Sequence, residues 1–597
     1  AYTYPGQGLS DPDPIAVVTL DSTAGTPTGG HTINIDVTDA QTGRNAGIQV
    51  LDDVGDVTFA GTNTLVCHGF EMHAASNKLQ VDCPIEHTPY KPQLYTRAYG
   101  AGSQIVMNNS VSASPSDQQL RLNPSPGLTI YSPNCTFTGD RKLLQPHPGE
   151  ADATAIFQAA EQFDGWQVYA YANDSTFQVV LPVQPTGYIP GIYVYSEGGV
   201  FQFMAQGDTD VNLLVGRPDE QFVIWDRDRD PLHADTVVTV GGNYDGGSGV
   251  CDMTIRAMGS IVGRHHRIDS SVEVLAGSTL YLDPQASALN LDNYYNNPDV
   301  NSGSTVLVPA VMHGAGTVRV LSADYAVQIK NGHELAANTI IEDGGTILMQ
   351  TDGVLTANTT VLAGGTLDLD GVDGDGNGGQ TLAGLGGGGT VLLGGATLTT
   401  GVSPGSSAGT LTINETGTVA LDATGESLFE LDTPGGTNDQ VVVAEADLTL
   451  GGTLVVEDLG GMAVGDVFTL FDVGTGVTGG SFTAMNNRTR YYAAVSIGGT
   501  DANDVLLTLT GEAIMGDVNK DGKVDGLDLT ALAASWDASG AQWADGDLTG
   551  DGTIDGLDLT ALAGNWDAVA NGPIPEPATL ALLSLGGAAL LRRRRRS

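Results

Sequence analysis

The sequence predicts a mostly β protein, built as a right-handed parallel β-helix and followed by a small α-helical module and a C-terminal apolar helix. Three observations lead to this prediction. Glycine supplies 82 of the 597 residues, whereas aromatic residues make up only 6%. Short runs of alternating apolar residues recur between glycine turns, which is typical of strands in repeated coils. A late duplication and a final apolar run ending in arginines indicate the last two elements.

The charge balance limits the classes of function. The chain carries 24 Lys and Arg against 70 Asp and Glu, a formal net charge of −46. A nucleic-acid binder needs a basic surface, so this class is disfavoured. Shifts in composition divide the chain into an N-terminal β-rich region (1–270), a repeat region (271–510), a duplicated module (511–568) and a tail (569–597).

Residues 1–270 hold most of the Cys, His and aromatic residues, so an active site or ligand pocket is expected there if the chain has one. In an extended strand, Asp226, Asp228 and Asp230 would share one face and Arg227 and Arg229 the other. Carboxylates beside arginines suit glycoside hydrolysis or polysaccharide lyase chemistry. A solvated strand with cross-strand ion pairs is the reading we prefer, because no second catalytic partner is evident.

The remaining chemistry-bearing residues of this region give weaker signals. His265 and His266 would point to opposite faces of a strand, which disfavours a shared metal ion. The chain has no CxxC pair, which leaves disulfides and buried free thiols both open for its cysteines. These cysteines are Cys67, Cys83, Cys135 and Cys251. We find no nucleophile elbow, P-loop, HExxH motif or dinucleotide fingerprint with a supporting strand–helix context.

The repeat region is predicted from recurring strand starts. Residues 274–283 read VLAGSTLYLD and residues 361–370 read VLAGGTLDLD, eight of ten positions being identical. Further Gly-x-Thr starts occur at Thr317, Thr346, Thr366, Thr390 and Thr453. The spacing of 20 residues between Thr346 and Thr366 suits one coil of a parallel β-helix, with an antiparallel β-sandwich as the alternative. The acidic stretch 373–378 begins like a calcium loop but has Gly384 at its twelfth position, so we expect a turn.

Three segments of the repeat region, 402–413, 437–443 and 450–456, resemble the passenger-associated repeats of autotransporter-like surface proteins. The resemblance implies a β-helix. It leaves the activity open, because such families include adhesins, structural surface proteins and polysaccharide-degrading enzymes.

Near the C-terminus the sequence repeats itself with a period of 30 residues. Residues 517–537 and 547–567 are identical at 14 of 21 positions. Each copy begins with a twelve-residue loop that has oxygen-bearing residues at positions 1, 3, 5, 9 and 12. Position 6 is a glycine, and position 7 can offer its backbone carbonyl. This is the spacing of an EF-hand-type calcium loop. The predicted ligands are Asp517, Asn519, Asp521, Lys523 (carbonyl), Asp525 and Asp528 in the first loop, and Asp547, Thr549, Asp551, Thr553 (carbonyl), Asp555 and Asp558 in the second.

Crowded carboxylates repel one another unless a divalent cation is bound, so we predict two Ca²⁺ ions and coupling of folding to ion binding. A single helix should follow each loop, with one apolar stripe per helix: Leu529, Leu532, Ala533 and Trp536, and Leu559, Leu562, Ala563 and Trp566. We expect the two stripes to bury each other. Residues 515–568 resemble the type I dockerin, and that resemblance implies calcium binding and a cohesin-like partner. Gly526-Leu527 and Gly556-Leu557 replace residues that often carry hydroxyls in the family.

The tail combines three ordered features. A Pro-Glu-Pro kink precedes fourteen uncharged residues, 578–591, and five arginines follow. A span of this length is short for a membrane of about 30 Å, and the arginines would keep the end of the tail cytoplasmic. The tail resembles a PEP-CTERM sorting signal, carried by Pro575, Glu576, Pro577, Arg592, Arg593, Arg594, Arg595 and Arg596. The resemblance implies transient anchoring by a transmembrane sorting helix, processing by an exosortase and export; a plain tail anchor is the alternative.

Together these patterns predict an exported, surface-sorted structural or adhesive protein that associates with a partner or with extracellular polysaccharide. The alternative is a secreted carbohydrate-active enzyme, a glycoside hydrolase or polysaccharide lyase, with the dockerin-like module as an appendage. The chain opens at Ala1 without Met or an apolar segment, so a signal peptide is expected to have been removed or to lie outside this sequence.

Overall fold

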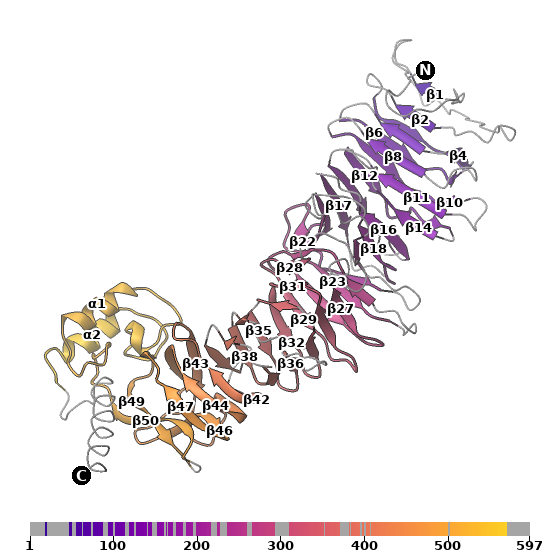
Figure 1. Cartoon of the computed structure of the whole chain (residues 1–597). Coiled ribbons are helices and arrows are strands. Elements are labelled where there is room, and N and C mark those ends of the chain that lie inside the picture. The colour runs from indigo at the N-terminus through magenta and orange to yellow at the C-terminus, as the bar shows by residue number, and fades with distance from the viewer. Residues whose placement is uncertain are drawn as a thin grey trace. The chain divides into compact units, whose positions relative to one another are not determined.

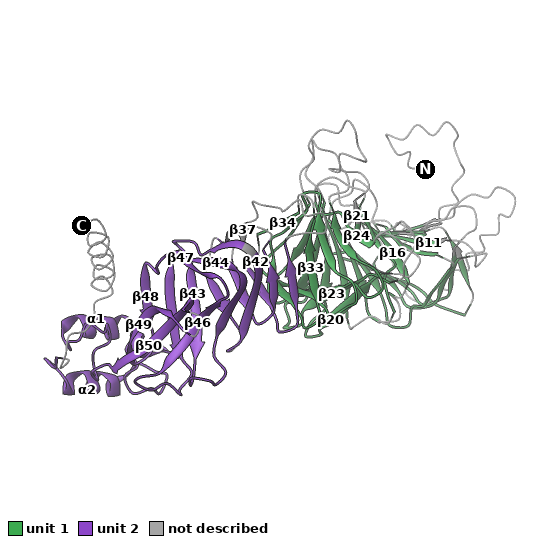
Figure 2. Ribbon diagram, turned by 60° about the horizontal axis from the view of Figure 1, so that its bottom comes forward, with its two compact units in different colours: residues 1–357 green, residues 358–597 purple. Residues whose placement is uncertain are grey.

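The computed structural model describes residues 18–20 and, with interruptions, residues 47–569 (Figure 1). The longer interruptions are 217–223, 227–235, 259–265, 293–309 and 370–380. The chain divides into two compact units, residues 1–357 and 358–597 (Figure 2). The boundary that the sequence predicts at 270/271 falls inside unit 1, and the predicted four-part organisation stays a prediction.

Unit 1 consists of parallel strands, each paired with a strand about one repeat away. Its first sheet contains β1 (Val18–Leu20), β2 (Gly47–Val50), β5 (Gly69–Met72), β8 (Leu94–Ala98), β11 (Gln119–Pro124), β14 (Arg141–Leu144), β16 (Trp166–Ala170), β18 (Ile192–Val194), β21 (Ile224–Asp226), β24 (His266–Ile268), β27 (Leu289–Asp292), β30 (Val327–Lys330) and β33 (Thr346–Met349). Its second sheet contains β3 (Val57–Phe59), β6 (Lys78–Val81), β9 (Gln104–Met107), β12 (Gly127–Tyr131), β15 (Ala153–Phe157), β17 (Thr176–Leu181), β19 (Val200–Ala205), β22 (Val237–Asn243), β25 (Val272–Val274), β28 (Val311–His313), β31 (Glu334–Leu335) and β34 (Val354–Leu355).

Two smaller parallel sheets complete unit 1. The third sheet contains β4 (Leu65–Cys67), β7 (Ile85–His87), β10 (Val111–Ala113) and β13 (Phe137–Thr138). The fourth contains β20 (Val211–Val215), β23 (Cys251–Arg256), β26 (Thr279–Asp283), β29 (Thr317–Val320) and β32 (Asn338–Ile341). All described strand pairs of unit 1 are parallel, which fits a β-helix. The antiparallel sandwich that the sequence left open for 271–510 is therefore wrong for the part of that region that lies in unit 1.

Unit 2 begins with parallel strands and ends with antiparallel ones. One parallel set contains β35 (Asn358–Val361), β38 (Gly384–Gly387) and β41 (Val402–Pro404), and another contains β36 (Thr366–Asp368), β39 (Thr390–Leu392), β42 (Thr410–Ala420), β44 (Gln440–Leu450), β46 (Val467–Val473) and β47 (Gly476–Gly480). Two short sets are β37 (Thr381–Leu382) with β40 (Thr397–Leu398), and β43 (Glu426–Leu431) with β45 (Thr453–Asp458) and β48 (Ala484–Asn487). β49 (Tyr491–Gly498) and β46 both pair with β50 (Asp504–Glu512) in antiparallel fashion.

The predicted strand starts coincide with observed ones. Thr317, Thr346, Thr366, Thr390 and Thr453 are each the first residue of a strand, namely β29, β33, β36, β39 and β45. The core consists of columns in which equivalent side chains stack: Leu280 is in register with Val318, and Leu282 with Val320. All four are fully buried. Glycine turns between short apolar runs therefore produce the parallel stacking expected from the sequence.

Aromatic residues of the N-terminal region belong to the core of unit 1. Tyr131 stacks on Phe157 with ring centroids 4.9 Å apart, and Trp166 meets Phe137 edge-on at 5.2 Å. Tyr131, Phe157 and Trp166 are fully buried. The four cysteines are buried thiols that form no disulfide, and burial raises the pKa of Cys251 to about 12. The open choice between disulfides and buried thiols is thus resolved for this structure in favour of thiols.

Neighbouring strands of unit 1 pack too closely at Gly216 to leave room for a side chain. The φ of Gly216 is +140°, and a Cβ there would overlap the carbonyl oxygen of Arg256. Gly207 also has a positive φ, of +63°, but a Cβ there would meet nothing within 4 Å. We expect Gly216→Ala to cost at least about 3 kcal/mol and Gly207→Ala only about 1 kcal/mol. Urea unfolding of the two variants measures the difference, and equal losses would show that the overlap is relieved without cost.

Asp439 makes the stability of unit 2 depend on pH. Its carboxylate is 1% exposed and accepts hydrogen bonds from the N–H groups of Gly409 and Glu430, each at 2.8 Å. Burial raises the pKa of Asp439 to about 6. Because the folded state holds the proton more tightly than the unfolded chain, this contribution to stability is full below about pH 4 and is lost as the pH rises through about 6.

We therefore expect the unfolding free energy to fall by at most about 3 kcal/mol between pH 4 and pH 7 through this group. Asp439→Asn is the matched variant, because its side chain does not titrate. The measurement is urea unfolding of both proteins at the two pH values. The difference between their pH dependences isolates Asp439, and identical dependences would contradict the assignment.

Candidate calcium site

The duplicated module forms two loops, each followed by one short helix. α1 spans Gly526–Ala534 and α2 spans Gly556–Gly564, with a 3-10 turn, η4, at Trp543–Asp545 between the copies. Asp525, at loop position 9, caps α1 by accepting a hydrogen bond from the N–H of Leu527 at 2.8 Å. Asp528, at position 12, accepts one from the N–H of Asp525 at 2.8 Å, which completes a capping box. The loop sequence therefore starts its own helix.

The second copy repeats these contacts. Asp555 accepts a hydrogen bond from the N–H of Leu557 at 2.7 Å, and Asp558 accepts one from the N–H of Asp555 at 2.9 Å. The carboxylates at position 12 also reach back to the start of each loop: Asp528 accepts from the N–H of Asn519 at 3.1 Å, and Asp558 from that of Thr549 at 3.0 Å. Position 12 thus closes each loop on its beginning.

The carboxylate at position 1 organises the turn of each loop. Asp517 accepts hydrogen bonds from the N–H groups of Asp521 and Gly522, at 3.1 and 3.0 Å. Asp547 accepts from the corresponding groups of Asp551 and Gly552, at 3.2 and 2.9 Å. Gly522 and Gly552, at position 6, have φ values of +85° and +80°, a conformation that glycine adopts without steric cost. The sharp turn expected at position 6 is present in both loops.

Four carboxylates of the two loops are buried. Asp517, Asp528 and Asp558 are 0% exposed and Asp547 is 5% exposed. None of the four forms an ion pair with a described Lys or Arg. Burial raises the pKa of Asp517, since desolvation penalises the charged form. Backbone N–H groups donate to these oxygens but do not neutralise their charge. The Lys520 ammonium group acts on Asp517 electrostatically without forming an ion pair with it.

The other predicted ligands lie at the surface of the loops. Asn519, Asp521, Thr549 and Asp551 are exposed, and Asn519 Nδ2 lies 3.5 Å from Asp521 Oδ2. Thr553 donates its hydroxyl to Asp551 at 2.7 Å. Asp525 and Asp555 are half-buried and act as helix caps. The loops therefore offer two buried anionic ends and a solvent-facing polar side.

In the described part of the chain, no group of three or more His, Cys, Asp or Glu side chains is close enough to form a preassembled metal site. The donor set of these loops nevertheless fits Ca²⁺, because it consists only of oxygen atoms and contains uncompensated carboxylates. A divalent cation would draw the carboxylates of each loop together, because it offsets their mutual repulsion. The twelve residues stay our predicted ligands.

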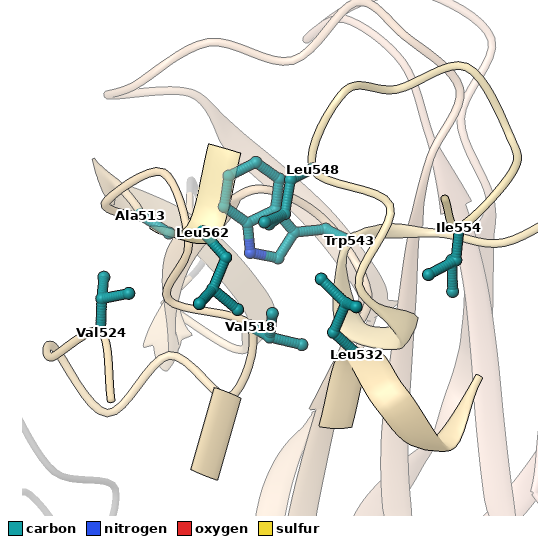
Figure 3. Packing of buried hydrophobic residues seen from close by; sticks show 8 residues of the cluster. All are labelled: Ala513, Val518, Val524, Leu532, Trp543, Leu548, Ile554 and Leu562. Carbon is teal, nitrogen blue, oxygen red and sulfur yellow. The ribbon is translucent and has the colours of Figure 1, made fainter. Parts of the chain in front are cut away.

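The two copies exchange contacts and enclose one core. Val524 N–H bonds to the carbonyl of Ala568 at 3.0 Å, and the equivalent Ile554 N–H bonds to that of Ala538 at 3.2 Å. Each loop therefore pairs with the segment that follows the helix of the other copy. Figure 3 shows the cluster that results, with Trp543 among the apolar side chains of both copies. Its members are Ala513, Val518, Val524, Leu532, Trp543, Leu548, Ile554 and Leu562.

The predicted apolar stripes of the helices are wrong in most of their members. Leu532 and Leu562 are 1% exposed, but Leu529 is 37% and Trp536 44% exposed, and Ala533 is exposed as well. The second helix behaves in the same way at Leu559, Ala563 and Trp566. The reason is that Val524, Ile554 and Trp543 fill the space between the helices, so that one leucine from each helix completes the core.

Sequence reasoning missed three side-chain hydrogen bonds that join the first loop to its surroundings. Tyr492 donates its hydroxyl to Asp517 Oδ2 at 2.6 Å, and Lys520 Nζ donates to the carbonyl oxygen of Asn487. Trp543 Nε1 donates to the carbonyl oxygen of Asp517 at 3.0 Å. The only signal in the sequence was Lys520 itself, which stands where the second copy has Gly550.

The candidate residues outside the duplicated module are only partly described by the structure. Asp226 ends β21, and Arg227, Asp228, Arg229 and Asp230 lie outside the described residues, so their shared face is untested. His265 also lies outside, whereas His266 begins β24, is 4% exposed and is in register with buried Leu289. The acidic stretch 373–378 is likewise not described.

The sorting residues Pro575, Glu576, Pro577 and Arg592–Arg596 and the predicted transmembrane segment fall in 570–597, outside the described residues. Among the helices that are described, none is both long and apolar enough to cross a membrane.

Comparison with known families supports both C-terminal elements. Residues 515–565 match the family model of the dockerin type I domain, and residues 573–596 match the PEP-CTERM protein-sorting motif. No curated protein matches the chain. The protein is thus of the exported, surface-associated class, with a dockerin-type module next to a sorting motif. Type I dockerins bind calcium and imply a cohesin partner, and the sorting motif implies processing by an exosortase.

Proposed function

We propose that this protein is a structural or adhesive component of the cell surface. In this proposal the parallel strands within residues 1–510 form a right-handed β-helix, which the antiparallel strands β49 and β50 end. The module binds two Ca²⁺ ions, one in each loop, and attaches the chain to a cohesin-like partner. An exosortase removes the tail, and the β-helix faces extracellular polysaccharide or a neighbouring scaffold.

The observation that carries the proposal is the pair of matched apolar surfaces on the module. Leu527 and Leu557, the second residues of α1 and α2, are 63% and 60% exposed, and Trp536 and Trp566 are 44% and 46% exposed. Exposed leucine and tryptophan at equivalent places are typical of a surface that binds another protein. Because the two copies expose these side chains equally, the same partner has two alternative places to bind.

Binding through the module is tested with a cohesin domain and the full chain. We expect calcium-dependent binding that survives Leu527→Asp or Leu557→Asp alone but is lost in the double variant. Surface plasmon resonance with and without a calcium chelator provides the measurement. Loss of binding in one single variant would restrict the interaction to one surface, and absence of binding to a panel of cohesins would contradict the proposed partner.

The role of residues 1–510 is tested by incubating the protein with acidic and neutral polysaccharides. Retention on the polysaccharide without release of reducing ends supports the adhesive role. Release of reducing ends or of unsaturated products supports the alternative, a carbohydrate-active enzyme. Deletion of residues 575–597 in the producing cell is expected to abolish tail processing and surface retention, and normal sorting of the truncated chain would contradict the exosortase proposal.

A further inference from the structure

The two calcium loops have the same carboxylates at positions 1, 5, 9 and 12 but different surroundings. Every hydrogen bond to the Asp547 carboxylate comes from its own loop: from Thr549, Gly550, Asp551 and Gly552. Asp517, its equivalent in the first loop, also accepts a hydrogen bond from Tyr492, at 2.6 Å. Tyr492 belongs to β49, outside the duplicated module. The first loop is therefore in direct contact with the last β-sheet of unit 2.

A second contact joins the first loop to β48, which belongs to the neighbouring sheet with β43 and β45. Lys520, at loop position 4, has a φ of +57° and donates its ammonium group to the carbonyl oxygen of Asn487, the last residue of β48. The equivalent Gly550 has a φ of +77° and makes no side-chain contact. A left-handed conformation is unfavourable for lysine but not for glycine. The contact with Asn487 is the interaction that offsets this strain in the first loop.

The end of β48, which accepts the hydrogen bond from Lys520, and the segment that leads into β49 are held in place by hydrogen bonds of their own. Asn487 donates its side-chain amide to the carbonyl of Tyr491 at 2.7 Å and accepts the hydroxyl of Thr489 at 2.8 Å. Next along the chain, Tyr492 packs against the core cluster of the module. Ala513, between β50 and the loop, is a member of that cluster, and its N–H bonds to the carbonyl of Arg490 at 2.8 Å. The sheet and the module thus share one core.

We propose that the first calcium loop is also the joint that fixes the module to the end of the β-sheet, so that calcium binding at this loop and docking on β48 and β49 stabilise each other. The inference rests on the proposed binding of calcium by both loops. Tyr492 is a positioning residue: its hydroxyl orients the Asp517 carboxylate, a predicted ligand. Coupling between two sites is reciprocal, so weakening the contact weakens the calcium affinity and removal of calcium loosens the contact.

The test compares calcium affinity at the two loops of the full chain. Asp551→Ala disables the second loop and Asp521→Ala the first, both at exposed positions, so calorimetric titration reports one loop at a time. We expect Tyr492→Phe to weaken calcium binding at the first loop by about tenfold and at the second by less than about twofold. Tyr491→Phe is the matched control: its hydroxyl donates to the carbonyl of Met462 at 2.6 Å, away from the loop, so the calcium affinity should not change.

Hydrogen exchange on the unaltered two-loop chain provides an independent measurement. Calcium is expected to slow exchange in β49, and Lys520→Gly or Tyr492→Phe should remove most of this effect. If the contact with Asn487 had no role, Lys520→Gly would only relieve backbone strain and would increase protection. Two results together would contradict the proposed joint: a calcium affinity of the first loop that Tyr492→Phe leaves unchanged, and hydrogen exchange in β49 that does not depend on calcium. Failure of the original chain to bind calcium at either loop would instead overturn the proposed function.

Discussion

Removal of calcium from the full chain is expected to unfold residues 515–569 and to leave the parallel sheets of unit 1 folded. The reason is the burial of Asp517, Asp528, Asp547 and Asp558, none of which forms an ion pair with a described Lys or Arg. At a thousandfold excess of Ca²⁺ over the dissociation constant, each bound ion stabilises the folded module by about 4 kcal/mol. Loss of two ions removes about 8 kcal/mol, more than a core of this size supplies on its own.

Hydrogen exchange read by mass spectrometry resolves the effect by region. In the presence of a chelator, α1 and α2 should lose their protection while strands such as β17 and β19 keep theirs, which makes unit 1 the internal control. Addition of excess calcium should restore the original pattern. Full protection of both helices after chelation would contradict the coupling of folding to ion binding.

Leu532→Ala is expected to destabilise the calcium-loaded module by about 2–5 kcal/mol, enough to unfold a large fraction of it. Leu532 is 1% exposed and lies in the core cluster shown in Figure 3. Removing its side-chain carbons leaves a cavity in a core to which each helix contributes only one leucine. Leu562→Ala should have the same effect, since Leu562 is equally buried in the second copy.

The matched control lies on the same helix. Leu529 is 37% exposed, so Leu529→Ala is expected to cost less than about 1 kcal/mol. Tryptophan fluorescence during urea unfolding reports on the module, which contains three of the five tryptophans, Trp536, Trp543 and Trp566. Equal losses for Leu529→Ala and Leu532→Ala would show that Leu529 is buried like Leu532, as the stripe pattern alone had predicted.

Local patterns predicted much of the fold. The Gly-x-Thr motif gave the first residue of β29, β33, β36, β39 and β45, because a glycine turn followed by alternating apolar residues is a local signal. The spacing of residues within the loops predicted the turn at position 6, the helix that follows each loop and the aspartate at position 12. The same spacing said nothing of which aspartates are buried, because burial depends on how the two copies pair. The aromatic residues of the N-terminal region were expected near a site and instead pack in the core at Tyr131, Phe157 and Trp166.

The sequence by itself was sufficient to predict the class of this protein. The reason is that the sorting motif, the calcium loops and the strand repeats are each defined by residues close together in the chain. The packing of distant segments decided the rest. Leu529 and Trp536 face outward because Trp543 and the opposite loop occupy the space they would have filled. The two loops differ because only the first meets Tyr492 and Asn487. Contacts between residues far apart in the sequence carry no periodic signal, and so they become visible only in three dimensions.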